Sequence, residues 1–422
     1  MSDGDMAIRR GRGECKMQGG KLVAASVQLH GSQVIRCVLD GDFFAEGNLD
    51  SPQVVDAVQG FLGECELPVS EADALAGGVS RILGEYPASS LIGATPGTIV
   101  TAFRRAVTAA TSQGSVQDPK VIGDGGTETP RHEASQRHTE VEPHLPDGPQ
   151  VSEELLTDFR GRWQKLPVTV VHDEPLMPSM QMACDHAIAQ AVAQGDCGAM
   201  IRVWEWAAST VVIGRFQSIG HQVDVEEARR EGVSVVRRVT GGGAMFVEPS
   251  NTITYSLYAP LSLVEGMTIE ESYRCCDDWI LAALQEIGID ARYEPINDIS
   301  SSAGKIGGAA QRRYAPKQGG PGAVLHHVTM SYDIDAQKMT RILKVSREKM
   351  KYKAVQSAVK RVDPLRSQSG LGREAIIGSL IDHLLRTMRW ARMGGIPAEI
   401  LQEAAKMDEG RFSTTQWTYR IA

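Results

Sequence analysis

The chain has 422 residues, longer than one typical domain, and its 42% hydrophobic and 23% charged residues are ordinary for globular domains with full cores. A formal net charge of −8 argues against a nucleic-acid coat, and no apolar run is long enough to span a bilayer. Seven scattered cysteines without a C-x-x-C pair fit reduced thiols better than a disulfide framework, so we expect a soluble cytoplasmic protein.

The first 111 residues predict a small α+β domain. Residues 21–29 and 33–39 alternate apolar and polar side chains like paired strands, with His30-Gly31-Ser32 as the turn between them. Residues 52–62 and 70–83 follow with helical periodicity, each opened by a Pro or a Ser. About 110 residues are enough for a separate small domain.

A change of composition separates this domain from the rest. Residues 112–150 are rich in Gly, Pro, Ser, Thr and charge, so they cannot bury enough surface to offset the entropy of ordering, and we predict a flexible linker. Residues 151–365 mix strands and helices, and residues 366–422 predict a helical C-terminal extension. The strands expected in the second domain are 167–171, 199–206, 211–214, 233–239, 251–258, 305–314 and 323–332, and its main helices are 179–193, 223–231 and 268–287.

Three consecutive glycines follow the predicted strand 233–239, which carries two arginines near its end. Glycine lets a backbone close on a ligand, and guanidinium suits a carboxylate or a phosphate. A tight turn is the simpler interpretation, but glycines cost about 1 kcal/mol each against alanine in regular structure, which favours a ligand-lining loop. Because side chains alternate along a strand, one of the two arginines should face the ligand. The residues concerned are Arg237, Arg238, Thr240, Gly241, Gly242, Gly243 and Ala244.

A single lysine, Lys305, stands among small residues, with Gly307 and Gly308 after it and Asn297-Asp298 upstream. An ammonium can act as a compact charge between two anions. An Asn-Asp pair can hold Mg²⁺ through oxygen ligands, although a surface lysine and an ordinary turn are the simpler alternatives. Together with the glycines, this pattern indicates the activation of a carboxylic acid by a nucleotide.

Two pairs of consecutive, potentially reactive residues can be explained by simple structural roles. His326 and His327 lie in a predicted strand and point to opposite faces, so we expect one to pack in the core and one to line the site. Cys275 and Cys276 lie inside a predicted helix, where nothing polarises a thiolate, and we expect core thiols.

Taken in order, these segments resemble lipoate–protein ligase A of the wider biotin/lipoate ligase family, over about residues 166–361. Any one match would be weak, but five in the correct order over about 200 residues are specific. The first 110 residues resemble the accessory domain of the same enzymes, on Gly20-Lys21-Leu22 and Gly41-Asp42-Phe43-Phe44. The matching segments of the main domain are Gly214–Gln217, Val235–Ala244, Asn251–Ser256, Asn297-Asp298 with Gly304–Gln311, and Val324–His327.

The resemblance implies a mixed-sheet α+β catalytic domain, here 151–365, beside a small α+β accessory domain, 1–111. It implies ATP and Mg²⁺, with lipoate or octanoate activated to an acyl-adenylate and passed to a lysine of a lipoyl-domain acceptor. That acceptor would be a 2-oxoacid dehydrogenase E2 or a glycine-cleavage H-like protein. By the same resemblance Lys305 is catalytic and Asn297 and Asp298 orient the metal. The residues implied to bind lipoate or ATP are Arg237, Arg238, Thr240, Gly241, Gly242, Gly243, Ala244, Gly307, Gly308, His326 and His327.

Three alternatives stay open. The family reads H-H-G-T where this chain has Val328, which keeps a catalytically silent relative in view. Amidotransferase relatives use a cysteine in the strand after the lysine segment, and this chain has Val328, Thr329 and Met330 there, which favours a ligase. The third alternative is a biotin-type ligase. Such enzymes usually carry a G-R-G-R-x-G loop in place of the R-R-x-T-G-G-G of this chain, which argues against it.

Overall fold

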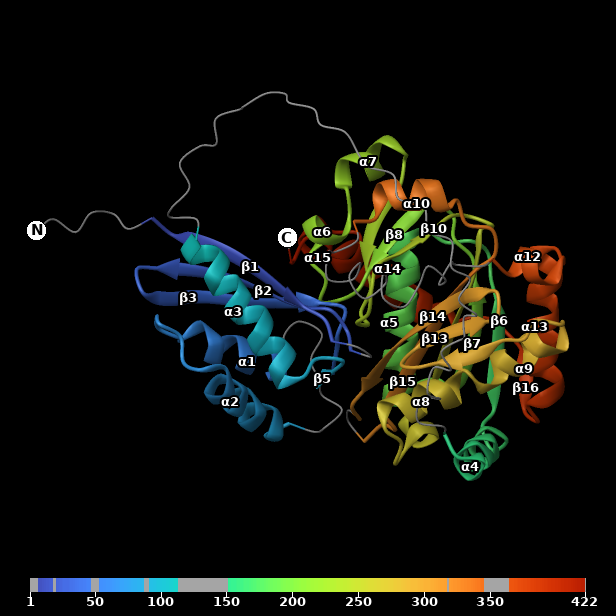
Figure 1. Cartoon of the computed structure of the whole chain (residues 1–422). Coiled ribbons are helices and arrows are strands. Elements are labelled where there is room, and N and C mark those ends of the chain that lie inside the picture. The colour runs from blue at the N-terminus through green and yellow to red at the C-terminus, as the bar shows by residue number, and fades with distance from the viewer. Residues whose placement is uncertain are drawn as a thin grey trace, which may run out of the picture.

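A computed structural model describes residues 7–17, 20–46, 53–86, 91–112, 151–316, 319–344 and 364–421. The predicted linker lies outside these residues, except for Ser112, which ends a helix. The described residues form an N-terminal unit (7–112) and a main unit (151–421), which pack against each other (Figure 1).

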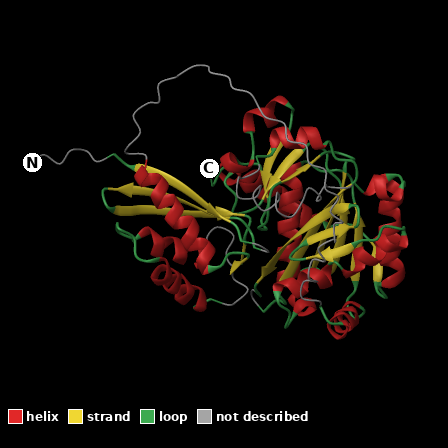
Figure 2. Ribbon diagram, in the orientation of Figure 1, coloured by secondary structure: helices red, strands yellow, loops and turns green. Residues whose placement is uncertain are grey.

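The N-terminal unit is a three-stranded antiparallel sheet, in the order β1-β2-β3, with helices packed against it (Figure 2). Both predicted strands and both predicted helices are confirmed to within two residues. Strand β1 and helix α3 were not predicted. Strand β1 is polar, and it is held in place by pairing with β2 and by packing against α3. The elements are β1 (Arg9–Cys15), β2 (Val23–His30), β3 (Gln33–Gly41), β4 (Phe44–Ala45), α1 (Gln53–Gly63), α2 (Ala72–Gly84), β5 (Leu91–Ile92) and α3 (Pro96–Ser112).

The main unit is built on a mixed sheet of eight strands, which confirms the predicted fold class. Its order is β12-β13-β14-β15-β11-β7-β6-β16, and β6 pairs in parallel with both β7 and β16 while the other pairs are antiparallel. A second sheet has the order β10-β8-β9. The strands are β6 (Val168–His172), β7 (Ala199–Trp204), β8 (Thr210–Ile213), β9 (Ser234–Arg237), β10 (Met245–Val247), β11 (Thr252–Pro260), β12 (Arg292–Glu294), β13 (Asp298–Ser301), β14 (Gly304–Tyr314), β15 (Ala323–Ser331) and β16 (Ala391–Met393).

Helices cover both faces of the large sheet. One core joins the sheet to α4, α8, α9 and α13, and a second core joins its other face to α5, α14 and the small sheet. Among the described residues, no helix combines the length and the apolarity needed to cross a bilayer. The helices are α4 (Glu153–Trp163), α5 (Pro178–Gln194), α6 (Ile219–Gln222), α7 (Val225–Arg230), α8 (Ile269–Cys276), α9 (Asp278–Glu286), α10 (Ala336–Ile342), α12 (Leu365–Ser369), α13 (Arg373–Thr387), α14 (Ala398–Met407) and α15 (Thr415–Thr418), with shorter turns η2 (Leu261–Val264) and η3 (Asp408–Phe412).

Of the predicted helices, one is divided and one is shortened in the structure. The segment 268–287 forms α8 and α9, which meet at the buried Asp277, whose carboxylate accepts hydrogen bonds from Tyr255 at 3.2 Å and His326 at 2.7 Å. The segment 223–231 forms only α7, because Asp224 caps that helix through the backbone N–H of Glu227. Side-chain contacts of two aspartates therefore set helix boundaries that periodicity alone did not show.

The C-terminal residues 366–422, predicted as a helical extension, pack within the main unit over the part that the structure describes. They also contain β16, which adds a parallel edge strand to the large sheet beside β6. Helix α14 packs against α5 through Ile400 and Ala404. We propose that this segment belongs to the catalytic domain.

Close packing of β1 on α3 makes a stability prediction. A Cβ added at Gly13 would lie 2.2 Å from the Ala102 carbonyl oxygen, whereas one added at Gly60 of α1 meets nothing within 4 Å. We expect Gly13→Ala to destabilise the N-terminal unit by about 1–3 kcal/mol through overpacking. We expect Gly60→Ala to stabilise it by up to about 1 kcal/mol, because alanine favours the helix. Denaturant unfolding of both variants checks this, and equal midpoints would contradict the packing.

Candidate functional site

Lys305 and Asp298 form an ion pair across the hairpin β13–β14. The Lys305 Nζ lies 2.8 Å from Asp298 Oδ1, and the lysine side chain is 37% exposed. A Cβ added at Gly308 would lie 3.3 Å from that Nζ, and one at Gly307 would lie 2.7 Å from the Thr329 carbonyl oxygen. Gly308 therefore leaves room beside a partly exposed ammonium, as an anion-binding group requires, and Gly307 lets the strand pack closely on β15.

Asn297, just before the hairpin, is hydrogen-bonded at both ends of its amide. Its Oδ1 accepts from Lys21 Nζ of the N-terminal unit at 2.5 Å, and its Nδ2 donates to the Ala309 carbonyl. In this arrangement Asn297 Oδ1 and Asp298 Oδ1 each face an ammonium, so a Mg²⁺ ion could bind there only after both lysines had moved away. Across the described ranges, no cluster of three or more His, Cys, Asp or Glu side chains could hold a metal. Magnesium stays an implication of the resemblance.

Arg237 is fully buried, and its guanidinium donates to backbone carbonyls on two sides. It joins the turn after β8 to the C-terminal helix α15, so it ties the C-terminal segment to that turn. The acceptors include the carbonyls of Gly214, Arg215, Gln217, Trp417 and Thr418, at 2.7–3.2 Å.

Arg238 holds the loop of Gly241, Gly242 and Gly243, which we call the glycine loop. Its guanidinium donates to the carbonyls of Gly241 at 2.6 Å and Gly243 at 2.9 Å. Burial lowers the pKa of Arg237 to about 9 and that of Arg238 to about 10, so both stay protonated at neutral pH. We predicted that one arginine would face the ligand. In the structure both guanidiniums bind backbone carbonyls, and ligand contact by either stays a prediction.

The glycine loop is closed against the N-terminal unit. A Cβ added at Gly241 would lie 2.4 Å from the Phe43 carbonyl oxygen and 2.8 Å from the Phe44 ring. Gly242 has φ of +92°, a conformation that favours glycine. Gly243 is exposed and Ala244 is half-buried. Contact between units is therefore one physical reason for the glycines, beside the ligand lining that the sequence suggested.

Three further contacts fix the N-terminal unit beside this loop. The Phe43 ring stacks on Phe216 with centroids 5.0 Å apart. The backbone N–H of Gly41 donates to the Phe216 carbonyl at 3.0 Å, and Gln217 donates to Asp42 at 2.8 Å. Both segments of the accessory-domain resemblance, around Lys21 and around Phe43, thus lie at the junction of the two units.

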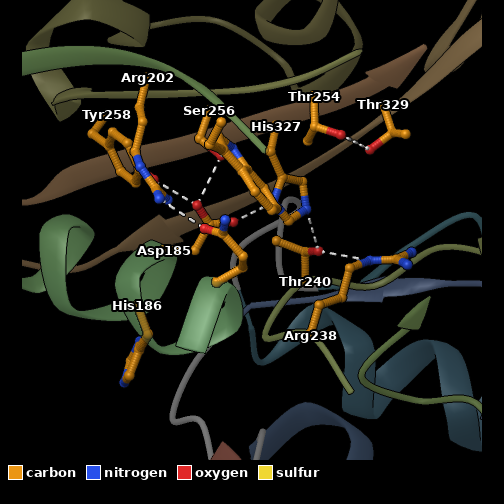
Figure 3. A network of polar contacts seen from close by, with 12 residues as sticks. Asp185, His186, Arg202, Arg238, Thr240, Thr254, Ser256, Tyr258, His327 and Thr329 are labelled. Atoms are coloured by element: carbon orange, nitrogen blue, oxygen red, sulfur yellow. Dashed lines mark hydrogen bonds and ion pairs between the residues drawn. The ribbon is translucent and has the colours of Figure 1, made fainter. Parts of the chain in front are cut away.

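His327 belongs to a buried polar network that ends at the glycine loop (Figure 3). Its Nδ1 lies 2.6 Å from Asp185 Oδ2, and its Nε2 lies 2.8 Å from Thr240 Oγ1. Thr240 in turn accepts from Arg238 at 3.0 Å. Asp185 also accepts from Ser256, at 2.8 Å, so the carboxylate orients the imidazole and, through it, the residues that hold the loop.

His326 points to the other face of β15, as the alternation along a strand predicts. It is fully buried, with Nε2 bonded to Asp277 and Nδ1 near the Gln311 amide. Of the two predicted histidines, the structure brings only His327 to the glycine loop, and ligand contact by either residue stays a prediction.

Two polar residues of this site were not predicted from the sequence. Asp185 is the one acidic residue of helix α5 and is buried, and a buried carboxylate is uncommon enough to signal a partner. Lys21 follows Gly19-Gly20 in the N-terminal unit, and nothing in the local sequence shows that it reaches Asn297.

The fold and the site define a mixed-sheet α+β catalytic domain with a lysine on a glycine-rich hairpin. The chain belongs to the lipoyl protein ligase A/B catalytic domain family, whose profile matches residues 177–389. The match begins after the N-terminal unit, so the accessory-domain resemblance of that unit stays a prediction.

Two curated relatives illustrate the range of the family. A putative lipoate-protein ligase A of Aeropyrum pernix is 31% identical over 166 residues, 39% of this chain and 58% of the relative. An octanoyltransferase LipM of Lysinibacillus sphaericus is 28% identical over 198 residues, 41% of this chain and 69% of the relative. The chain thus spans little more than half of the ligase relative.

Solved structures support the fold of the main unit. A bi-partite lipoate protein ligase from Thermoplasma acidophilum, studied with its E2 lipoyl domain, has a TM-score of 0.52 and 25% identity. That similarity covers 61% of this chain and 98% of the other. A lipoate-protein ligase A bound with ATP has a TM-score of 0.50 at 22% identity, which shows the fold alone.

The buried pair Asp185–His327 predicts a pH dependence of stability. Burial lowers the pKa of His327 in the folded state, although the Asp185 carboxylate opposes that effect. At pH values between this lowered pKa and the pKa of the unfolded chain, the unfolded state binds more protons than the folded state. Stability should therefore fall as pH drops below about 6.5, the usual histidine value. We expect His327→Gln to lose less Tm than the parent between pH 7 and 5. His30→Gln, at an exposed position, is the control. Identical pH profiles for all three proteins would contradict the assignment.

Proposed function

We propose that this chain is an ATP-dependent lipoate–protein ligase. It would activate lipoate or octanoate as an acyl-adenylate and transfer the acyl group to the ε-amine of a lysine on a lipoyl domain. The observation that carries the proposal is the partly exposed Lys305 ammonium, paired with Asp298 on a hairpin whose glycines leave room for an anionic ligand. The bi-partite ligase relative, studied with an E2 lipoyl domain, supports the acceptor class.

The chemistry needs a cation where two anions meet. A carboxylate repels a phosphate, and its oxygen must attack the α-phosphorus of ATP as pyrophosphate leaves. In the proposal Lys305 turns from Asp298 to bridge the acid and the α-phosphate, and it stabilises the charge of the transition state. The acceptor amine then attacks the acyl carbon, an amide bond forms, and AMP leaves with the electron pair of the broken bond.

The cysteines support a ligase over an octanoyltransferase. A nucleophilic cysteine needs a lowered thiol pKa. Burial instead raises the pKa of six of the seven cysteines, to about 12 at Cys37 and Cys275 and about 11 at Cys184 and Cys197. In β15, the strand that follows the lysine hairpin, Val328 and Met330 are buried apolar residues.

The N-terminal unit completes the proposal as an accessory domain. The curated subunit 1 of a Thermoplasma acidophilum lipoate-protein ligase A aligns over 90% of its length with only 56% of this chain. We propose that the N-terminal unit supplies in one chain what a bi-partite ligase places on a second. Its Phe43 and Phe44 close on the glycine loop, as a domain that covers a nucleotide would.

Substitution of the central lysine tests the proposal. We expect Lys305→Ala to lower lipoate-dependent pyrophosphate release by about 10² or more, since one well-placed charge contributes several kcal/mol to a transition state. Lys406→Ala, whose side chain is 75% exposed on α14, is the matched control. Running wild type with lipoate, octanoate and biotin identifies the acid. Normal turnover by a folded Lys305→Ala protein would refute the role of Lys305.

A second test separates the two family activities. We expect iodoacetamide to leave pyrophosphate release unchanged, because the buried thiols have raised pKa values. We also expect no transfer from an octanoylated carrier protein in the absence of ATP. Nucleotide-independent transfer that alkylation abolishes would place the chain with the octanoyltransferases instead.

A further inference from the structure

Lys21 lies at the junction of the two units and is held there by its own backbone. Its N–H donates to the Gly93 carbonyl at 3.0 Å. Gly93 has φ of +80°, and a Cβ added there would lie 2.4 Å from Lys21 Cγ. The glycine thus leaves the space through which the lysine stem passes from the N-terminal unit toward hairpin β13–β14.

The ammonium of Lys21 ends beside a neutral group and a second cation. Its Nζ lies 2.5 Å from Asn297 Oδ1 and 5.5 Å from the centre of the Phe44 ring. The carboxylate of the hairpin, Asp298, is already paired with Lys305. Asn297 and Asp298 are consecutive residues, so the ammoniums of Lys21 and Lys305 are held at the same short segment of chain, which carries one carboxylate.

We propose that Lys21 binds the polyphosphate of ATP beside Lys305, so that the N-terminal unit contributes a phosphate-binding residue to the active site. The inference rests on the proposed ligase function. A triphosphate suits a site with two ammoniums, because it carries several negative charges along its length. Further negative charge develops on the pyrophosphate as it leaves, and the ammoniums can stabilise that charge. Lipoate carries a single carboxylate, which Lys305 alone can serve.

A docking role is the competing explanation, since Lys21 also bridges the units through Asn297. The two roles predict different effects of substitutions at Lys21. Glutamine can still donate a hydrogen bond to Asn297 but has no charge. Arginine keeps the charge. A docking bridge tolerates glutamine, whereas a phosphate site tolerates arginine better.

The experiment measures nucleotide binding and both half-reactions in the full chain. We expect Lys21→Gln to raise the Kd for ATP about tenfold or more and to slow pyrophosphate release, while the Kd values for lipoate and adenosine stay within about twofold. Transfer from preformed lipoyl-AMP should change little, because pyrophosphate is absent from that step. Lys21→Arg should recover part of the ATP affinity. Arg81→Ala, which removes a 71% exposed charge on α2, is the control.

Other outcomes separate the two proposals. Wild-type ATP affinity in a folded Lys21→Gln protein overturns the role of Lys21, and so does an equal loss of ATP and adenosine binding. In either case the ligase proposal stands as long as wild type releases pyrophosphate with lipoate. Absence of that release from wild type would reject the ligase proposal itself. Should Lys21→Gln fail to fold, Lys21→Met removes the same charge and is judged by the same ATP-to-adenosine comparison.

Discussion

The glycine loop is held from two directions by groups that leave no space for a side chain at Gly241 and Gly242. From inside, Arg238 binds the carbonyls of Gly241 and Gly243. From outside, the Phe43 carbonyl lies where a Cβ of Gly241 would have to stand. The shape of the loop is therefore set jointly by the main unit and the N-terminal unit. A change in the docking of one unit must reach the loop of the other, because packed backbones do not compress.

Local patterns predicted much of this site, and distant partners account for what they missed. Most strands of the large sheet and the glycine loop follow from periodicity and glycine placement, which act over a few residues. The mixed sheet was implied by the family resemblance, and strand β13, which pairs with the lysine strand β14, was not predicted. Asp185 and His327 are 142 positions apart, and Lys21 and Asn297 are 276 apart. No spacing rule connects such pairs, because the fold alone brings them together.

One expectation failed because of a tertiary contact that the sequence did not display. Apolar periodicity predicted one helix over 268–287, but the carboxylate of Asp277 is fixed by His326 of β15. A tertiary hydrogen bond of a polar residue therefore accompanies the break between α8 and α9. The two arginines, in contrast, bind different parts of the fold, Arg237 the turn after β8 and helix α15, and Arg238 the glycine loop.

In the proposed ligase, the charges at the junction connect nucleotide binding with the docking of the units. Lys21 of the N-terminal unit and Lys305 of the main unit reach the consecutive residues Asn297 and Asp298, and their like charges oppose docking except as far as the Asp298 carboxylate offsets them. A polyphosphate between the two ammoniums replaces repulsion by attraction. By thermodynamic linkage, docking must then strengthen nucleotide binding by the same factor by which the nucleotide strengthens docking. Under the ligase proposal the departure of pyrophosphate removes that attraction, so the step that forms the adenylate would also weaken the contact of the N-terminal unit with the glycine loop.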